Sequence, residues 1–534
     1  PRDSLKEDSF SHPMAQKKRY LKITLQGEVI EGRPHPSFFS PRDQLSLPLL
    51  LKLIDAARRH KRVQALMLVL KKVSIGWGAI QEIHQELQSF HEAGKRSLAY
   101  LETANNRNYY LACGAQQVYV PPSATVDLVG LRAEMFFFKN LLEYLGVEPQ
   151  LFGLGKYKSA GEIFTRETMS EPHRSMLDSI LTDLQKQLVE KIADRSNVTP
   201  HQVQEWIDQG PYTARQAAEL GLIDGIHYQD EVEDLLAGPE TGLRRLSPGK
   251  LRVEEGWLKR WVTFYRPQIA YLVAEGVLTT GESPRRGGRR PALDSESLTH
   301  FLRNARKRKR VKAVVIRINS PGGSALASDL LWREIQLTDQ KKPVIVSFGD
   351  VAASGGYYLA TAGRRILGMP ATLTGSIGVI YGKFNLAKLL TKLGITVDAL
   401  DKGKRAGYLS PARPFSKGEA EAIQEQMREF YEELFLKKVA ESRKKSLEEV
   451  RKLAEGRVWT GAQALENGLL DQVGGLVQAV ERAQEEAGLP KNKKVRLVHF
   501  FRRRTLRDLL SFPLPGGLLD HHVLALMADD FRIH

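Results

Sequence analysis

A serine set among small residues is the first position in this sequence that could do chemistry. Ser354 lies in DVAASGGYYLATAG (350–363), directly after the apolar run KKPVIVSFG (341–349). A buried strand that turns sharply into a helix can present a serine hydroxyl as the nucleophile of an acyl transfer. A small residue at a tight helix contact would give the same local pattern, so the turn alone does not decide the role of Ser354.

A glycine turn in INSPGGSALAS (318–328) is the second stretch of this kind. Pro321 fixes its own φ angle, and Gly322 and Gly323 accept conformations that are closed to other residues. A backbone N–H can therefore turn outward where the preceding strand ends. Together with the N–H of Gly355, it would offer two donors to the oxyanion that develops during acyl transfer. The turn and the serine predict an oxyanion hole built from Gly322, Gly323 and Gly355.

A serine nucleophile also needs a base. The chain has 13 histidines, but none forms a recognisable arrangement with an acid near Ser354. Lys156 and Lys158 lie in GLGKYKSAGEIF (153–164), among small and apolar residues rather than in an open basic run. A lysine can act as the base when burial lowers its pKa. On composition alone, an ordinary surface position is the more frequent role for each of these two lysines.

The elements that carry these residues occur twice along the chain. KRVQALMLVL (61–70) matches KRVKAVVIRI (309–318), and a YYLA motif recurs at the same spacing of 248 residues. TARQAAELGLIDGI (213–226) then matches TGAQALENGLLDQV (460–473) with a spacing that differs by one residue. Self-similarity over such a distance indicates two copies of one domain.

Each copy has the pattern of an α/β unit. In the second copy, the apolar stretches KAVVIRIN (312–319) and PVIVSF (343–348) enclose a helix-like stretch, ASDLLWREIQL (327–337). Two buried strands joined through a helix are typical of a parallel sheet. A long charged helix is predicted over 417–443, where it would pack on the core or form a subunit interface.

The composition indicates a globular protein of several domains, with 42% hydrophobic residues among 534. The single cysteine, Cys113, can form no intrachain disulfide, and no Cys or His cluster has metal-ligand spacing. Neither a metal nor another cofactor is therefore expected. No run reaches the roughly 18 apolar residues of a membrane-spanning helix.

The formal net charge of +17 is concentrated in two segments, 281–310 and the tail from Pro490 onward. The tail also has apolar residues interleaved with its basic ones. Such a segment can lie on an anionic membrane surface. A solvated charged face explains the charge equally well. The stretch SPRRGGRRP (283–291) has no periodicity and is expected to be a flexible loop.

Four segments resemble the signature segments of signal peptide peptidase A, also called protease IV, in its long two-copy form. They are, in chain order, GKYKSAGEIFTRETMS, INSPGGSALAS, DVAASGGYYLA and LTGSIGVI, and the resemblance extends over about residues 20–485. The resemblance implies a membrane-associated serine endopeptidase with a Ser/Lys dyad. It further implies two tandem α/β domains of the crotonase or ClpP type, with added helices, and a homotetramer.

The same motifs imply which residues form the site. Ser354 would be the nucleophile and Lys158 the general base, preferred over Lys156 because the family motif centres on it. Ser376 matches the serine that orients the lysine amine. A base that works near neutral pH needs its pKa lowered by about three units from its value in water, near 10.4. Lys158 is thus expected in an apolar pocket with no carboxylate beside it.

The duplication then suggests that the two copies supply different residues of one site. At the spacing of 248 residues, Asn106 stands in the first copy where Ser354 stands in the second, and Ala406 in the second copy corresponds to Lys158. The first copy also has KKVSIG (71–76) in place of the glycine turn. One complete site is therefore expected where the two copies face each other across a cleft.

These observations lead to one expected organisation of the chain. Residues 1–19 form an N-terminal segment that follows a lost anchor or signal, and residues 20–250 form a first copy that supplies the lysine. Residues 251–485 form a second copy that supplies the serine and the oxyanion hole, and residues 486–534 form a basic amphipathic tail. Expected partners are hydrophobic peptides, including cleaved signal peptides, and the extracytoplasmic, periplasmic face of the cell membrane, but no nucleic acid. The alternatives are a crotonase-like acyl-CoA enzyme and a non-catalytic basic scaffold that binds membranes.

Overall fold

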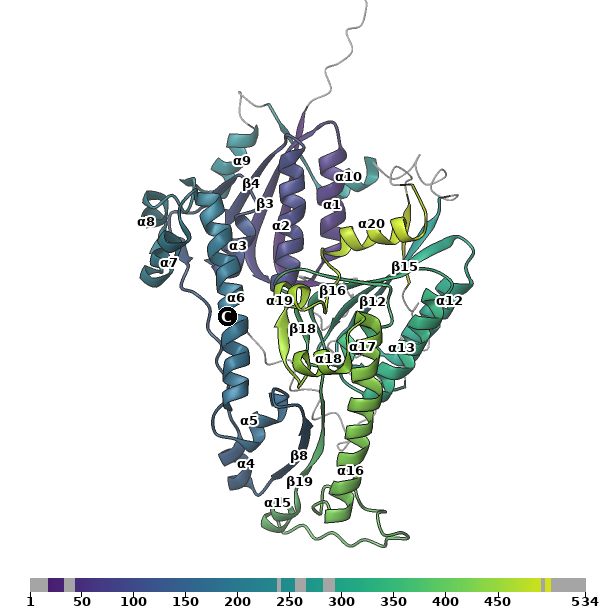
Figure 1. The fold of residues 1–534 in the computed structure, drawn as a ribbon. Coiled ribbons are helices and arrows are strands. Elements are labelled where there is room, and N and C mark those ends of the chain that lie inside the picture. Colours follow the sequence, from purple (N-terminus) through teal and green to yellow (C-terminus); the bar gives the residue numbers. More distant parts are fainter. Residues whose placement is uncertain are drawn as a thin grey trace, which may run out of the picture.

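The computed structural model describes residues 18–32, 44–237, 242–254, 266–281, 293–490 and 495–500 (Figure 1). Most of the N-terminal segment, the loop expected at 283–291 and the tail after residue 500 lie outside these ranges. The expectation for the loop, and that for the tail beyond residue 500, therefore concern residues that the structure does not describe.

The sheet of the first copy is mostly parallel, and its central strands are buried. β3 (Val63–Ser74) reads VQALMLVLKKVS, an almost continuous apolar run of the kind found in strands that are covered on both faces. In spatial order, the described strands of this sheet are β10 (Gly225–Ile226), β6 (Gln117–Val120), β4 (Arg96–Leu101), β3, β1 (Arg19–Ile30) and β11 (Arg244–Leu246), with β2 (Gln44–Ser46) also paired to β1.

The sheet of the second copy repeats this order. Its described strands are β21 (Gln472–Val473), β17 (Arg365–Gly368), β16 (Val344–Ala353), β15 (Val311–Ser320), β12 (Gln268–Glu275) and β22 (Arg496–His499), and β18 (Leu373–Gly375) and β20 (Val458–Thr460) continue from β16. In the first copy, the corresponding small sheet holds β5 (Ala104–Asn105), β7 (Thr125–Asp127) and β9 (Tyr212–Thr213). The predicted α/β class and the duplication are confirmed. β22 falls within 486–534, so the second sheet includes residues that were expected in the tail.

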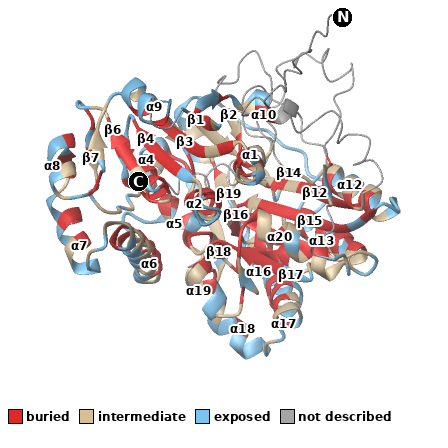
Figure 2. Cartoon of the chain, turned by 90° about the horizontal axis from the view of Figure 1, so that it is seen from above, coloured by how far each residue is buried: buried red, intermediate tan, exposed pale blue. Residues whose placement is uncertain are grey.

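Helices cover both faces of each sheet. The described helices that cover the sheet of the first copy include α1 (Leu47–Arg59), α2 (Trp77–Glu92), α3 (Asn106–Ala112), α6 (Glu171–Ser196), α7 (Pro200–Gln209), α8 (Ala214–Glu219), α9 (Gln229–Ala237) and α10 (Pro248–Glu254). Those of the second include α12 (Ser295–Lys307), α13 (Ala325–Asp339), α14 (Gly355–Ala360), α18 (Leu447–Leu453), α19 (Gly461–Glu466) and α20 (Leu476–Glu486). Figure 2 shows the buried residues gathered on the strands and on the inner sides of these helices.

The two copies share one hydrophobic core. Leu476 and Ala479 of α20 belong to the same buried cluster as the helices α1 and α2 of the first copy. Tyr271 and Val315, on one face of the second sheet, belong to it as well. Separating the copies would expose this whole face. That exposure is unfavourable, because the free energy gained from apolar burial is roughly proportional to the area removed from water. The copies are therefore fixed relative to each other.

A buried ionic cluster crosses the same boundary. Arg317 of β15 is fully buried, and its guanidinium lies 2.7 Å from Glu31 of the first copy and also contacts Glu82 of α2. Glu82 accepts a further hydrogen bond from the N–H of Leu476, at 2.7 Å. The cluster joins a central strand of one copy to a helix of the other.

A second connection is an arm at the lower end of the molecule in Figure 1. β8 (Glu148–Leu154) of the first copy pairs antiparallel with β19 (Val379–Asn385) of the second, from Leu154 opposite Val379 to Glu148 opposite Asn385. α4 (Lys139–Leu145) and α15 (Ala387–Lys392) lie beside this ribbon. The pairing brings the segment that follows β8 next to the segment that precedes β19.

The predicted long helix over 417–443 forms, but it is not regular throughout. α16 (Lys417–Glu429) continues into a π-helical stretch, Phe430–Leu436, and then into α17 (Lys437–Arg443). Tyr431 and Phe435 of the π-helical stretch are buried in the core of the second copy, as expected for packing on the core. Across the described part of the chain, we find no helix with the length and apolar character needed to cross a membrane.

Candidate active site

Ser354 stands at the sharp turn between β16 and α14. Its φ and ψ are 52° and −117°, a conformation that residues with a side chain rarely adopt. The next residue, Gly355, begins the helix, so its N–H has no partner within the helix. The predicted strand-to-helix turn is therefore present. It holds the serine in a strained conformation that resembles the turn found around nucleophiles in α/β hydrolases.

Lys158 reaches this serine from the other copy. Its Nζ lies 3.1 Å from Ser354 Oγ, 2.9 Å from Ser376 Oγ and 3.0 Å from the carbonyl oxygen of Ser376. Burial lowers the pKa of the Lys158 amine to about 7. Burial is the cause of this shift, and the contacts of the amine that the described residues provide are neutral oxygens.

The geometry suits a neutral amine. Such an amine has two N–H groups and one lone pair. The carbonyl and hydroxyl oxygens of Ser376 can accept the two N–H groups, which leaves the lone pair for the hydroxyl hydrogen of Ser354. Ser376 itself has a φ of 50°, and in this conformation both of its oxygens lie within hydrogen-bond distance of the amine. In this arrangement Lys158 can take a proton from Ser354.

Lys156, the rival lysine, does not reach the serine. It is exposed, and its amine lies over the ring of Tyr157, 5.2 Å from the ring centroid. Its backbone N–H donates to Glu455 instead. The structure thus brings together three of the predicted side chains, those of Ser354, Lys158 and Ser376.

The glycine turn abuts the serine turn. A side chain at Gly322 would place its Cβ 2.8 Å from both the nitrogen of Gly355 and the Cβ of Ser354. The N–H of Gly322 donates to Ser320 Oγ at 3.2 Å. By contrast, the N–H groups of Gly323 and Gly355 have no partner among the residues that the structure describes. These two groups are therefore the available donors for an oxyanion.

Among the described residues of the first copy, the positions that correspond to Ser354 and its partners do not form a second site of this kind. Asn106, at the position that corresponds to Ser354, is buried, and its amide nitrogen donates to the carbonyl oxygen of Gly130 at 2.7 Å. Its amide oxygen accepts the N–H of Val129 at 3.2 Å. Ala406 is exposed. Asn106 therefore binds the backbone of a nearby loop. The side chains of Ser354, Lys158 and Ser376 come together where the two copies meet.

The segment that carries Lys158 is tied to the first copy by residues that sequence reasoning missed. Glu162 of α5 (Glu162–Thr165) accepts hydrogen bonds from the hydroxyl of Ser170 at 2.5 Å and from its backbone N–H at 3.1 Å. Nδ1 of the fully buried His173 lies 3.1 Å from the same carboxylate. Ser170 is the N-cap of α6, and a serine before a helical pattern was the signal that could have located this anchor.

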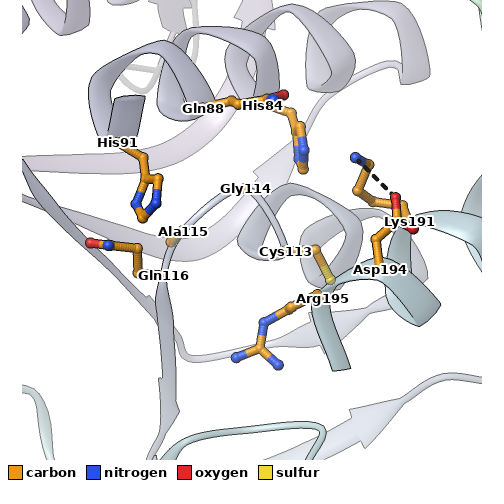
Figure 3. A pocket seen from close by; sticks show the side chains of 10 residues that line it. All are labelled: His84, Gln88, His91, Cys113, Gly114, Ala115, Gln116, Lys191, Asp194 and Arg195. Carbon is orange, nitrogen blue, oxygen red and sulfur yellow. Dashed lines mark ion pairs between the residues drawn. The ribbon is translucent and has the colours of Figure 1, made fainter. Parts of the chain in front are cut away.

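A cavity of about 390 Å³ lies in the first copy, away from these residues (Figure 3). His84, Cys113 and Lys191 are among the residues that line it. At the corresponding position to His84, the second copy has the larger Trp332, with the amine of Lys438 lying 3.7 Å from its ring centroid. Ser354, Lys158 and Ser376 take no part in this cavity.

Comparisons with known proteins identify the family to which the chain belongs. The family model "Peptidase family S49" matches the chain twice, over residues 89–241 and 336–490. "Serine protease SPPA, chloroplastic" of Arabidopsis thaliana is 38% identical over 512 residues, 94% of this chain and 74% of that protein. "Protease 4" of Salmonella typhi is 30% identical over 514 residues, 90% of this chain and 78% of that protein.

A solved structure of a ClpP1 mutant from Listeria monocytogenes also matches, with 15% identity and a TM-score of 0.26, over 42% of this chain and 99% of that chain. The family match occurs once in each copy, and the two relatives above extend along nearly the whole sequence. This chain therefore belongs to peptidase family S49 and is a serine peptidase.

Proposed function

We propose that the chain cleaves peptide bonds with Ser354 as the nucleophile and Lys158 as the general base. The observation that carries this proposal is the 3.1 Å separation between Lys158 Nζ and Ser354 Oγ, with the amine buried. Lys158 takes the hydroxyl proton while Oγ attacks the carbonyl carbon of the substrate. The N–H groups of Gly323 and Gly355 donate to the oxyanion that forms.

The remaining steps reuse the same groups. When the tetrahedral intermediate collapses, the Lys158 ammonium gives its proton to the leaving amine, and the C–N bond breaks to leave an ester on Ser354. A water molecule then attacks the ester carbonyl while Lys158 accepts its proton. The C–O bond to Ser354 breaks, the proton returns to Oγ, and the acid product leaves. Ser376 keeps the amine oriented through both halves of the reaction.

The preferred substrates are hydrophobic peptides, among them cleaved signal peptides. A cavity of about 350 Å³ between β8 and α16 supports this proposal, because Leu151, Phe152 and Met427 give it an apolar part beside the polar Gln424 and Arg428. β8 leads directly into the segment that carries Lys158, so an apolar side chain bound there would lie close to the site. Peptide hydrolysis is favoured over acyl-CoA chemistry or a scaffold role by the protease relatives and by the paired serine and lysine.

The proposal extends to a homotetramer at the extracytoplasmic face of a membrane. In the first copy, the segment after β8 crosses to Ser354 of the second copy, whereas the corresponding segment of the second copy, around 401–414, extends to the tip of the arm. Nearby, Leu393 and Leu400 are 63% and 95% exposed. A segment that repeats the crossing into a neighbouring chain would form a head-to-tail ring. The net charge of +17 supports binding to an anionic surface.

Single substitutions test the two catalytic roles. Ser354→Ala is expected to lower the hydrolysis of a fluorogenic hydrophobic peptide by about 10³-fold or more. Lys158→Met is expected to lower it by on the order of 10²–10⁴-fold, because the serine loses its base. Lys156→Met is the matched control and should keep wild-type activity. A fluorophosphonate, which labels activated serines, should modify Ser354 in the wild type and in Lys156→Met only. Hydrolysis retained by Ser354→Ala or Lys158→Met would reject the corresponding role.

A further inference from the structure

A short turn of the second copy, Glu455–Arg457, packs against the backbone of the segment that carries Lys158. It lies between α18 and β20 and contains two residues with positive φ, Glu455 at 54° and Gly456 at 78°. The carbonyl oxygen of Glu455 accepts the N–H of Tyr157 at 2.8 Å. The Glu455 carboxylate accepts the N–H of Lys156 at 3.2 Å. The turn therefore binds the backbone immediately before Lys158.

The same turn also binds the backbone around Ser376. The N–H of Gly456 donates to the carbonyl oxygen of Ile377 at 2.8 Å. The carbonyl oxygen of Arg457 accepts the N–H of Ser376 at 2.7 Å. Consecutive residues of one turn thus hold both the segment that carries the base and the residue that orients it.

Gly456 is the point of closest approach. A Cβ at this position would lie 2.5 Å from the backbone nitrogen of Lys158 and 2.7 Å from its Cα and Cβ. These are distances that real Cβ atoms essentially never show, and two of the three atoms that would have to move belong to the backbone. The approach is reciprocal, because a Cβ at Gly155 would lie 2.4 Å from the carbonyl carbon of Glu455. The two chain segments interlock through their glycines.

The ring of Tyr157 adds a side-chain contact between the two segments. The Arg457 guanidinium lies 5.1 Å from the centroid of this ring and 4.3 Å from that of Trp459. A cation stacked between two aromatic rings resists displacement of either. Backbone hydrogen bonds, close glycine contact and stacking therefore act together on three consecutive residues, 156–158.

From these contacts we infer that the turn Glu455–Arg457 is a positioning element for the general base, and that Gly456 is the residue on which it depends. The inference rests on the proposed role of Lys158. The turn sets how far the Lys158 backbone stands from the turn that holds Ser354. A displacement of about 1 Å at a reacting group can lower a rate by about 100-fold. Any side chain at residue 456 forces such a displacement and draws the amine out of its buried position.

The test compares two glycine-to-alanine variants of the full chain. Gly456→Ala is expected to lower kcat by about 100-fold, with a smaller change in KM. The midpoint of its pH–rate profile should move upward from about 7, because an amine that leaves the pocket regains its ordinary pKa. Gly221→Ala is the matched control, since Gly221 has a nearly equal φ of 75° but no atom within 4 Å of an added Cβ. It should keep both the wild-type kcat and the wild-type midpoint.

A second pair of variants covers the case in which Gly456→Ala does not fold. Glu455→Ala removes the acceptor for the N–H of Lys156 and is expected to lower kcat several-fold and raise the midpoint, while Glu455→Gln keeps an acceptor oxygen and should restore both. Wild-type kcat and midpoint in Gly456→Ala, or in Glu455→Ala where Gly456→Ala does not fold, would overturn the inference. If Lys158→Met remained active, the proposed base itself would fail, and that outcome is distinct from the loss of this positioning role alone.

Discussion

At the scale of single residues, the proposed reaction depends on a lysine, Lys158, whose amine can lose its proton near neutral pH. An ammonium group in water would hold its proton until about pH 10.4 and could not accept another. The protein changes this by enclosing the amine and giving it neutral oxygen partners, both from Ser376. The low pKa is therefore obtained by desolvation, at a cost to the stability of the protonated state.

The titration of Lys158 yields a prediction about rate and stability together. In the proposed mechanism the neutral amine is the base, so activity should rise with pH through a single ionisation near 7. The folded-state pKa lies below the unfolded value of 10.5, so the stability penalty is complete below pH 7 and disappears as pH rises toward 10.5. Lys158→Met should therefore raise the thermal unfolding temperature most at pH 6 and hardly at pH 10.

Thermal unfolding at pH 6, 8 and 10 and a pH–rate profile of the wild type check these expectations. Lys156→Met serves as the control for removing a positive charge, and its unfolding temperature should differ little from that of the wild type at each pH. A rate that rises only near pH 10 would show that the amine is not desolvated in the working enzyme.

At the scale of elements, the segment from Gly155 to Thr165 determines where the base lies. One end is fixed by the turn Glu455–Arg457 of the second copy, and the other by the hydrogen bonds that Glu162 of α5 accepts from the N-terminus of α6. Although partial burial opposes it, the hydrogen bonds from Ser170 and His173 lower the pKa of Glu162 overall. Burial lowers the pKa of His173. An ionised carboxylate thus faces a set of donors at a helix N-terminus, a favourable arrangement.

Glu162→Ala should weaken this second attachment. Ser170 and His173 would lose their shared acceptor, with an expected loss of about 1–3 kcal/mol in the free energy of unfolding and a fall in kcat of about 10-fold. Since the folded pKa is depressed, the stabilisation is present above pH 4.5 and is lost as the pH falls below it. Urea unfolding and peptide hydrolysis measure the two effects. Glu171→Gln, an exposed acid in the first turn of α6, is the control and should keep full activity.

At the scale of the whole molecule, the site exists because the two copies cannot move apart. They share a hydrophobic core, and Arg317 of one copy is buried against Glu31 and Glu82 of the other. Two carboxylates around one guanidinium leave an excess negative charge in a buried place. Burial raises the pKa of Glu31 to about 8 and raises that of Glu82 as well.

The ionic cluster leads to a prediction about the pH dependence of folding. The folded pKa of Glu31 lies above its unfolded value, so its contribution to stability is full below pH 4.5 and is lost as the pH rises through about 8. Glu31→Gln should therefore flatten the decline in stability over this range. Arg317→Met should lower the free energy of unfolding by about 3–5 kcal/mol, because it leaves two buried carboxylates unpaired.

Denaturant unfolding of the wild type and both variants at pH 5, 7 and 8 measures these changes. Arg333→Met, which removes an exposed arginine of α13, is the control and should change stability little. An Arg317→Met variant as stable as the wild type would show that packing alone holds the copies together.

The sequence by itself determined the fold class and the duplication, and it marked Ser354, two lysines and the glycine turns as candidates for the site. These are local signals: a buried strand, a glycine turn and a repeated motif can each be recognised without knowing what lies across the fold. The choice of Lys158 over Lys156 rested on the resemblance to a family, since the two residues have nearly the same sequence surroundings. Asn106 stands in the first copy at the position that corresponds to Ser354, and this difference already suggested that neither copy forms a complete site alone.

Only the tertiary structure decided which groups meet. Arg317 occupies the position in an apolar strand of the second copy that corresponds to Val69 of the first copy. Its carboxylate partners are more than two hundred residues away in the chain, so no local pattern reveals the cluster. Gly456 looks like an ordinary turn glycine until the backbone of Lys158 is found against it. The physical reason is common to both: a pKa, a close backbone approach and a buried ion pair depend on distances between segments, and chain folding rather than residue type sets those distances.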